Sequence, residues 1–430
     1  MLGREPFQAA GGSGASRTWE PEHVCRSETG AEKISVLEMK DVAAEATCRT
    51  PHVRQAYSSA TDARQAAHEF YEGVAQPEME FVLFYCSNDY DQETLAAELR
   101  NLFAGVQVIG CTSAGEIGPG GYCERGLTGA SFAGEAFCAV TGRIGNLQQF
   151  EASVAENMAQ RLMQELERKA PEANAENTFA LLLIDGLSVR EEQVARSLQA
   201  TLGRIPLAGG SAADGLNFAG TAVFLDGQFW PNSAIVLLAT TPLPFTVFKT
   251  QHFSPTDQRL VITGADVARR TITEINGLPA AEEYARLLGI EVDDLDPHRY
   301  ASTPVVVLID GSNYVRSIQK TNPDGSMTML CAIDEGVVLR LGQGSDMVQN
   351  LEQAIGQVKD AIGPPQVLLA YDCFLRRLEI LQRQIDADIS RVLLDNNAVG
   401  FSTYGEQFCG IHVNQTMTGI AIGYPRGAHA

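Results

Sequence analysis

The sequence predicts an α/β protein with internally duplicated strand–helix–strand units in mixed sheets. Three observations carry this prediction: apolar runs of strand length, intervening segments with apolar residues at helical spacing, and a loop of small residues after each second strand. The units begin at Phe81, at Phe179 and at Pro365. The first two are expected to form related α/β halves that share a mixed sheet.

Apolar spacing predicts a helix before the first unit and one inside each of the first two units. Their apolar faces are, in chain order, Ala66, Phe70 and Val74; Leu95, Leu99 and Leu102; and Val194, Leu198 and Leu202. Ser188, followed three residues later by Glu191, predicts a capping box that opens the last of these helices.

Three segments are expected along the chain. Residues 1–60 are rich in small and polar residues without periodicity, which predicts a disordered N-terminal extension. Residues 61–242 hold the duplicated unit and form an N-domain. Residues 243–430 form a C-domain with an Asn276-Gly277 turn before a helix, a hairpin around residues 322–325, and the third unit.

Composition excludes several classes of partner and predicts a cytoplasmic protein. A net charge of −21 argues against binding to nucleic-acid phosphates or to anionic lipid. No apolar run approaches the roughly 18 residues of a membrane span, and the first residues lack the apolar core of a secretory signal. Nine cysteines without a C-x-x-C pair indicate reduced thiols.

No enzyme is expected, because the common catalytic signatures fail. The sequence has no phosphate-binding G-x-x-x-x-G-K-[ST] loop, no nucleophile elbow and no H-E-x-x-H pair.

The small-residue loops are the candidate ligand sites. Residues 110–116 and 400–406 both read G-x-[ST]-[ST]-x-G-E, and residues 209–215 keep part of this pattern. Such loops expose backbone N–H groups beyond strand ends and let a ligand approach closely. The candidate residues are Gly110, Cys111, Thr112, Ser113, Gly115 and Glu116; Gly209, Gly210 and Ser211; and Gly400, Ser402, Thr403, Gly405 and Glu406. Tight turns without a ligand, capped by the two glutamates, are the alternative.

These loops resemble the FIST family of sensory domains, N-domain plus C-domain. The resemblance rests on Val108–Ile117, Gly209–Gly215 and Val399–Glu406 and covers roughly residues 75–425. The stretches YDQETLAAELRNLFAGVQVIGCTSAGEIGPGGYC and GIHVNQTMTGIAIG are most similar to the NosP branch. That resemblance implies a sensor that binds haem b, takes nitric oxide as its ligand and signals to a partner histidine kinase or cyclic-di-GMP enzyme. A homodimer stays open.

A haem site of this kind needs a proximal imidazole, and two histidines are candidates for the iron ligand. His412 follows the third loop directly and is slightly favoured, and His252 ends the strand FTVFKTQHF. Cys111 and tyrosines remain other options. Arg376 and Arg377 could pair with propionates. The aromatic side chains that could clamp the macrocycle are Phe374, Phe401, Tyr404 and Phe408. A structural role in core or surface is the alternative for each.

Two other functions stay open. One is a FIST-type module for a small metabolite such as an amino acid, its carboxylate held by the loop N–H groups. The other is a hydrolase that uses Ser113, Ser211 or Ser402 with Glu116 or Glu406, which would need a histidine within hydrogen-bond reach of the serine.

Overall fold

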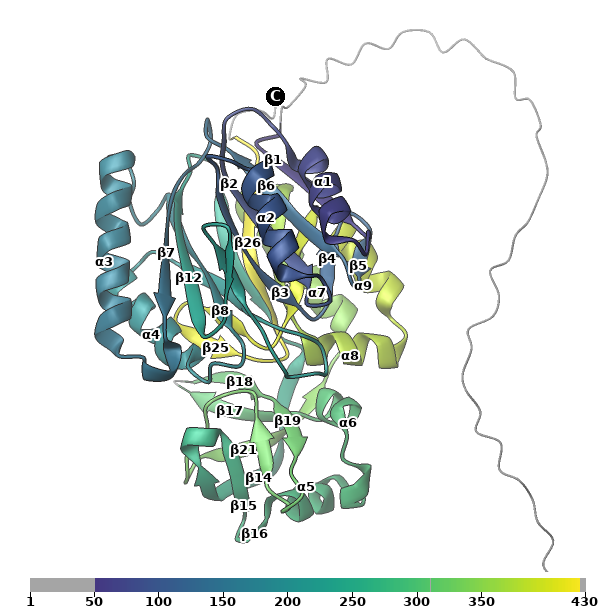
Figure 1. Ribbon diagram of the computed structural model, residues 1–430. Coiled ribbons are helices and arrows are strands. Elements are labelled where there is room, and N and C mark those ends of the chain that lie inside the picture. Colours follow the sequence, from purple (N-terminus) through teal and green to yellow (C-terminus); the bar gives the residue numbers. More distant parts are fainter. Residues whose placement is uncertain (1–50, 310, 426–430) are drawn as a thin grey trace, which may run out of the picture. The chain divides into compact units, whose positions relative to one another are not determined.

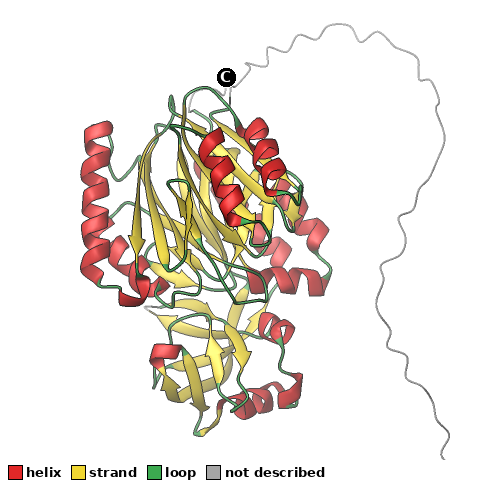
Figure 2. Ribbon diagram, in the orientation of Figure 1, coloured by secondary structure: helices red, strands yellow, loops and turns green. Residues whose placement is uncertain are grey.

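Three α/β units and an inserted fourth sheet make up the part of the chain that the structure describes (Figure 1). The computed structural model describes residues 51–309 and 311–425. Strands lie at the centre of each unit, and helices lie on the outside (Figure 2). The predicted α/β class with mixed sheets is confirmed, since each unit has one parallel strand pair and otherwise antiparallel neighbours.

The strand orders of the three unit sheets follow one plan. The first sheet runs β1 (Val53–Ser58), β6 (Leu127–Ala133), β2 (Met79–Ser87), β3 (Gln107–Ser113), β10 (Val223–Leu225), β11 (Gln228–Trp230). The second runs β25 (Ile411–Val413), β24 (Glu406–Phe408), β9 (Leu207–Ala212), β8 (Thr178–Asp185), β12 (Ser233–Thr240), β7 (Cys138–Gly145). The third runs β13 (Phe245–Thr250), β26 (Met417–Gly423), β22 (Pro365–Cys373), β23 (Ala398–Thr403), β4 (Glu116–Gly118), β5 (Gly121–Cys123).

The fourth sheet, with its helices, forms what we term the appended domain, residues 253–344. Its order is β18 (Ser312–Arg316), β17 (Val305–Ile309), β21 (Val338–Gly344), β14 (Phe253–Asp266), β15 (Thr271–Ile275), β20 (Met327–Met329), β19 (Ile318–Thr321), with β16 (Leu278–Pro279) beside β15. Its helices are α5 (Ala280–Leu288) and α6 (Pro297–Ser302), with the short 3-10 turns η2 (Val267–Arg269) and η3 (Val292–Asp294). The Asn276-Gly277 turn and the hairpin at residues 322–325 form as predicted.

The helices cover the outer faces of the unit sheets. They are α1 (Ala63–Val74) and α2 (Gln92–Leu102) on the first; α3 (Ala152–Lys169) and α4 (Glu191–Leu202) on the second; and α7 (Met347–Ile362), α8 (Phe374–Arg383) and α9 (Asp386–Leu394) on the third; the 3-10 turn η1 (Leu147–Gln149) precedes α3. The predicted apolar faces of α1, α2 and α4 are buried, except that Leu102 is only partly so.

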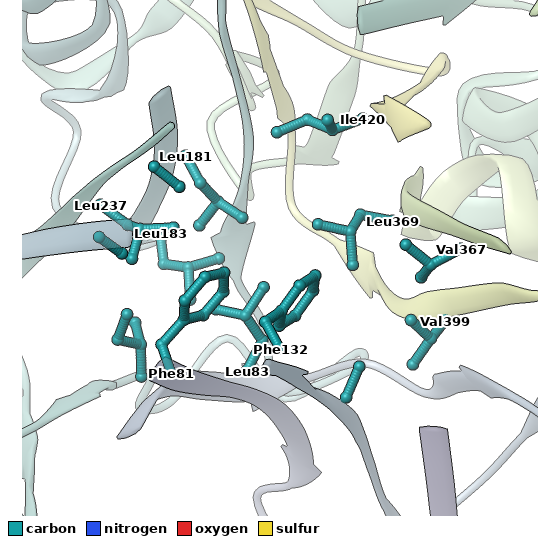
Figure 3. Close-up of a cluster of buried hydrophobic side chains, with 14 of the residues drawn as sticks. Phe81, Leu83, Phe132, Leu181, Leu183, Leu237, Val367, Leu369, Val399 and Ile420 are labelled. Carbon is teal, nitrogen blue, oxygen red and sulfur yellow. The ribbon is translucent and has the colours of Figure 1, made fainter. Parts of the chain in front are cut away.

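The inner faces of the three sheets meet in one apolar cluster (Figure 3). Successive side chains of a strand point to opposite faces, so Leu181 and Leu183 of β8 enter this cluster while Leu182 packs beneath the helices. Phe81 and Leu83 of β2, with Leu369 of β22, reach the same cluster from the other sheets. Burial on both faces explains why these strands read as continuous apolar runs.

Hairpin exchange joins the units in a ring. The hairpin β4–β5 of the first unit pairs with β23 of the third, β24–β25 of the third pairs with β9 of the second, and β10–β11 of the second pairs with β3 of the first. Each small-residue loop therefore leads out of one sheet and into another.

Four details of the sequence analysis need correction. The first two units do not share one sheet, because each parallel pair is closed by its own antiparallel strand, β6 or β12. The predicted boundary of the N-terminal extension, residue 60, is too late, because residues 53–58 form β1, which pairs with β6. Residues 1–50 lie outside the described part. The expected C-domain of residues 243–430 is not one continuous unit, because the appended domain is inserted within the third unit, between β13 and α7.

The predicted capping box is wrong as well. The side-chain oxygen of Ser188 has no hydrogen-bond partner within the described residues, and α4 begins without a side-chain cap. Glu191 instead forms a buried ion pair with Arg270 of the appended domain, 2.6 Å away.

Glycine at the parallel strand pairs permits their close approach. A Cβ at Gly400 would lie 1.7 Å from the carbonyl oxygen of Ala370, and one at Gly209 would lie 1.9 Å from that of Leu182. Gly110 occupies the same register, 2.6 Å from the carbonyl oxygen of Phe84. The repeat therefore conserves a backbone contact at these positions.

Gly400→Ala should destabilise the protein by about 3 kcal/mol or more, because strand β22 would have to move away from β23. Chemical unfolding of the variant and its parent measures the change. Gly356→Ala is the matched control, since its Cβ would meet nothing within 4 Å in α7 and should stabilise by about 0.5–1 kcal/mol. Equal effects of the two substitutions would contradict the close-approach explanation.

Candidate functional site

The small-residue loops bond chiefly to one another. The N–H of Ala114 donates to the carbonyl of Ser402 at 3.0 Å, and the N–H of Ser402 donates to that of Gly115 at 2.8 Å. The N–H of Ser211 donates to the carbonyl of Gly405 at 2.9 Å, and Tyr404 donates back to Ser211 at 3.3 Å. These four N–H groups are thus bonded to the neighbouring loop and are not free to hold the carboxylate of an amino acid.

The loops of the first and second units are joined in the same way. The N–H of Thr112 donates to the carbonyl of Ala222, and the carbonyl of Thr112 accepts from Ala213, both at 3.0 Å. The side chain of Cys111 is buried in the central cluster, and a Cβ at Gly210 would lie 2.7 Å from Thr403. Small residues in these loops permit the units to meet.

The two loop glutamates are buried caps. Glu116 accepts from Ser113 Oγ at 2.5 Å and from the N–H of Gly126 at 2.9 Å. Glu406 accepts from Thr403 Oγ1 at 2.5 Å and from Thr416 Oγ1 at 2.7 Å. Burial raises the pKa of Glu116 to about 7 and that of Glu406 to about 8. Each side chain therefore closes its loop.

The serines lack the geometry of a hydrolase. Ser113 bonds to Glu116, Ser211 Oγ accepts from Gln407 Nε2 at 2.9 Å, and Ser402 Oγ has no hydrogen-bond partner among the described residues. None of the histidines in the described ranges hydrogen-bonds to any of these three oxygens.

His412 is buried with both ring nitrogens engaged. Gln407 Nε2 donates to Nδ1 at 3.2 Å, and Nε2 lies 3.3 Å from the carbonyl oxygen of Leu330, which it can only reach as a donor. Its ring packs against Gly405, where a Cβ would lie 2.2 Å from Cε1. Burial lowers the pKa of His412 to about 4, so the imidazole is neutral at pH 7.

His252 is held equally firmly, by a buried cluster beneath α8. Its Nε2 lies 3.1 and 3.0 Å from the two carboxylate oxygens of Glu379, and Arg376 Nη1 donates to Nδ1 at 3.2 Å. Arg376 Nε lies 2.9 Å from Asp372 Oδ1, and Tyr122 donates to the other oxygen of Asp372. Burial lowers the pKa of His252, although Glu379 opposes this.

The buried cluster around His252 and Arg376 stabilises the junction between the third unit and the appended domain. His252 lies between β13 and β14, where the chain enters the appended domain, and Ser345 lies where it leaves. The carbonyl of His252 accepts from both the N–H and the Oγ of Ser345, at 2.9 and 2.8 Å. The two crossings are therefore tied together beside Arg376.

The remaining haem candidates do not gather around one slot. Phe401 stacks on Tyr85 in the central cluster, with ring centroids 4.6 Å apart, and Tyr404 stacks on Phe218 at 4.7 Å. Phe408 is half-buried, 6.0 Å from Lys249 Nζ. Arg377 pairs with Asp386. Phe374 lies edge-on to Tyr404 at 6.3 Å.

A cleft of about 1150 Å³ opens between α4 and the appended sheet, and sequence reasoning missed it. Gln193 and Arg196 line it from α4, and the residues facing them include Arg259, Leu308, Val338 and Arg340. The sequence feature that could have pointed to this cleft is an arginine in each of the apolar runs 259–262 and 338–341. Without the pairing of β14 with β21, nothing in the sequence places those runs side by side.

His412 lies just behind one wall of this cleft. Arg316 lines the cleft and donates from Nη1 to the carbonyl oxygen of His412 at 3.0 Å. The segment with Leu330, which contacts the His412 ring, continues into Ala332 and Ile333 of the cleft wall. The imidazole itself does not line the cleft.

Three α/β units joined by exchanged hairpins, with an inserted sheet, define the structural class. Comparison with protein families matches the FIST N domain over residues 80–278 and the FIST C domain over residues 280–409. The chain is thus a member of the FIST-domain proteins, as the sequence resemblance implied. FIST domains are sensory, ligand-binding modules of signalling proteins. No curated protein matches the chain.

Within residues 51–309 and 311–425, no helix is long and apolar enough to cross a membrane. The same residues contain no group of three or more His, Cys, Asp or Glu side chains placed to hold a metal ion.

Glu406→Gln should remove part of a pH dependence of stability. The folded pKa of about 8 lies above the ordinary 4.5, so the folded protein holds a proton that the unfolded chain releases. The proton on Glu406 therefore adds to the free energy of unfolding. This addition is fully present below pH 4.5 and is lost as the pH rises through 8, by at most about 1.4 kcal/mol for each pH unit. Unfolding measured from about pH 5 to about pH 8 should show a flatter slope in the variant.

The matched control is Glu352→Gln, an exposed position on α7, which should keep the slope of the parent. If Glu406→Gln and Glu352→Gln gave the same slope, the buried carboxyl would not hold its proton in the folded protein.

Proposed function

We propose that this protein is a sensor whose ligand binds in the cleft between α4 and the appended sheet. The observation that carries the proposal is the cleft itself, whose volume of about 1150 Å³ suits a small organic molecule. Its walls combine exposed apolar side chains with arginines, a mixture that buries a ligand and also orients it.

Binding at this place would act on the contact between two parts of the fold. Arg270 of the appended domain pairs with Glu191 and Glu192 at the start of α4, and the N–H of Ala332 donates to Glu192 at 2.6 Å. Ala332 also lines the cleft. A ligand that prefers one arrangement of α4 and the appended sheet would shift the population toward it. A partner histidine kinase or cyclic-di-GMP enzyme would read the difference.

Haem, with nitric oxide as the signal, is the specific form of this proposal. Its support is the similarity to the NosP branch, together with the match between a flat apolar macrocycle with two carboxylates and an apolar cleft with arginines. The histidines do not fit an iron ligand as they stand, since both rings are engaged at both nitrogens.

Titration of the purified protein with haemin, followed by reduction and exposure to nitric oxide, tests the haem proposal. A saturable Soret band that shifts with nitric oxide is expected. Its loss in His412→Ala, but not in His252→Ala or in the exposed control His298→Ala, would name the iron ligand. Leu308→Asp, at a position 66% exposed, should weaken haem binding without disturbing either histidine.

Two outcomes would contradict the haem proposal. If the parent and all variants show only the spectrum of free haem, haem is not the ligand, and the cleft remains as the site for another molecule. If Leu308→Asp binds haem as the parent does, haem does not occupy the cleft.

A further inference from the structure

Two arginines lie directly opposite each other in the wall of the cleft. Arg259 of β14 and Arg340 of β21 are partners in the antiparallel register. Like charges at such positions destabilise a sheet, by up to about 1 kcal/mol. Within the described residues, Arg259 has no carboxylate within 4 Å, and Arg340 has only the fully exposed Asp257 at 3.8 Å. The sheet therefore carries a concentrated positive charge that the described side chains leave largely uncompensated.

An exposed apolar surface adjoins this pair. Val338 lies two residues from Arg340 on the same face of β21, and Leu308 lies two residues beyond Val306, the partner of Arg340 on β17. Leu308 is 66% exposed and Val338 49%. The exposed large apolar side chains of the described residues number nine, and the four that line this cleft are Val267, Leu308, Ile309 and Val338. Such a concentration at one place marks a binding surface.

Charge adds a second argument. The lining contains Arg196, Arg259, Arg316 and Arg340 but a single carboxylate, that of Asp334, in a chain whose net charge is −21. Arg196 lines the cleft from α4, opposite the sheet, and takes part in none of the ion pairs of the described residues. The cleft is thus a positive region in a negative protein, and such a region selects anions.

We infer that the ligand of this cleft is an amphipathic anion. Its carboxylate, sulfonate or phosphate group lies between Arg259 and Arg340, and its apolar body lies on Leu308 and Val338. A small polar anion would leave the apolar wall exposed, and a neutral apolar molecule would leave the arginine pair uncompensated. The inference rests on the proposed function, because it specifies the ligand of that same site.

A pair of fluorescent probes tests it, since they share an apolar body and differ in charge. The probes are 8-anilinonaphthalene-1-sulfonate, which is anionic, and N-phenyl-1-naphthylamine, which is neutral. The parent should bind one molecule of either probe per chain, and its affinity for the anionic probe should be the higher. Arg259→Gln with Arg340→Gln should weaken sulfonate binding at least about tenfold and change binding of the neutral probe less than about twofold.

Two further variants complete the design. Leu308→Asp should weaken both probes, because it places a carboxylate on the apolar wall. Arg299→Gln is the matched control: this exposed arginine lies on α6, outside the cleft lining, and its loss should change neither probe.

The outcomes separate the inference from the proposed function. If the parent binds neither probe, the cleft is not a ligand site and both fail. If both probes bind equally well to the parent and to the double arginine variant, the anion inference fails and the cleft survives as a site. If the chain sediments as a dimer that excludes both probes, and Leu308→Asp makes it monomeric, a second copy covers the cleft and both are overturned.

Discussion

The burial of three sheet faces against one another is the constraint on which the rest of the structure depends. Each unit sheet has one face under helices and the other in the central cluster, so both faces are buried and their side chains are mostly apolar. Strands of different sheets can meet this closely only where their side chains are small. Gly210 meets that demand, since a Cβ there would lie 2.7 Å from Thr403 of another sheet. The glycines at 110, 209 and 400 permit a similar close approach within each parallel pair.

The exchanged hairpins connect the three packed units by strand pairing. Since every unit lends a hairpin to a neighbour, none has a complete sheet by itself. The loops that connect parent sheet and hairpin must cross the meeting place of the units. Their backbone groups bond to one another there, and Glu116 and Glu406 close them from within. A loop pattern typical of ligand binding thus serves as the joint between units.

The appended domain places the proposed ligand cleft away from those joints. It enters and leaves the third unit at His252 and Ser345, where the buried cluster of Arg376 and Glu379 fixes both crossings. Its other attachment is the pair between Arg270 and the start of α4. The cleft lies between this attachment and the exposed face of the appended sheet, and residues of both α4 and the appended domain line it.

The sequence by itself determined the three units with the helices and turns predicted for them, because periodicity and turn chemistry act over a few residues. The resemblance of its loop motifs also pointed to the FIST family, which the family comparison shows. It also singled out His252 and His412 as the histidines to consider, and both proved to be buried. Only the tertiary structure decided what those residues contact. Whether a loop N–H is free, whether a histidine nitrogen is engaged, and whether Arg259 faces Arg340 all depend on which strands pair. Pairing between strands far apart in the chain depends on how whole faces pack, and no short stretch of sequence records that.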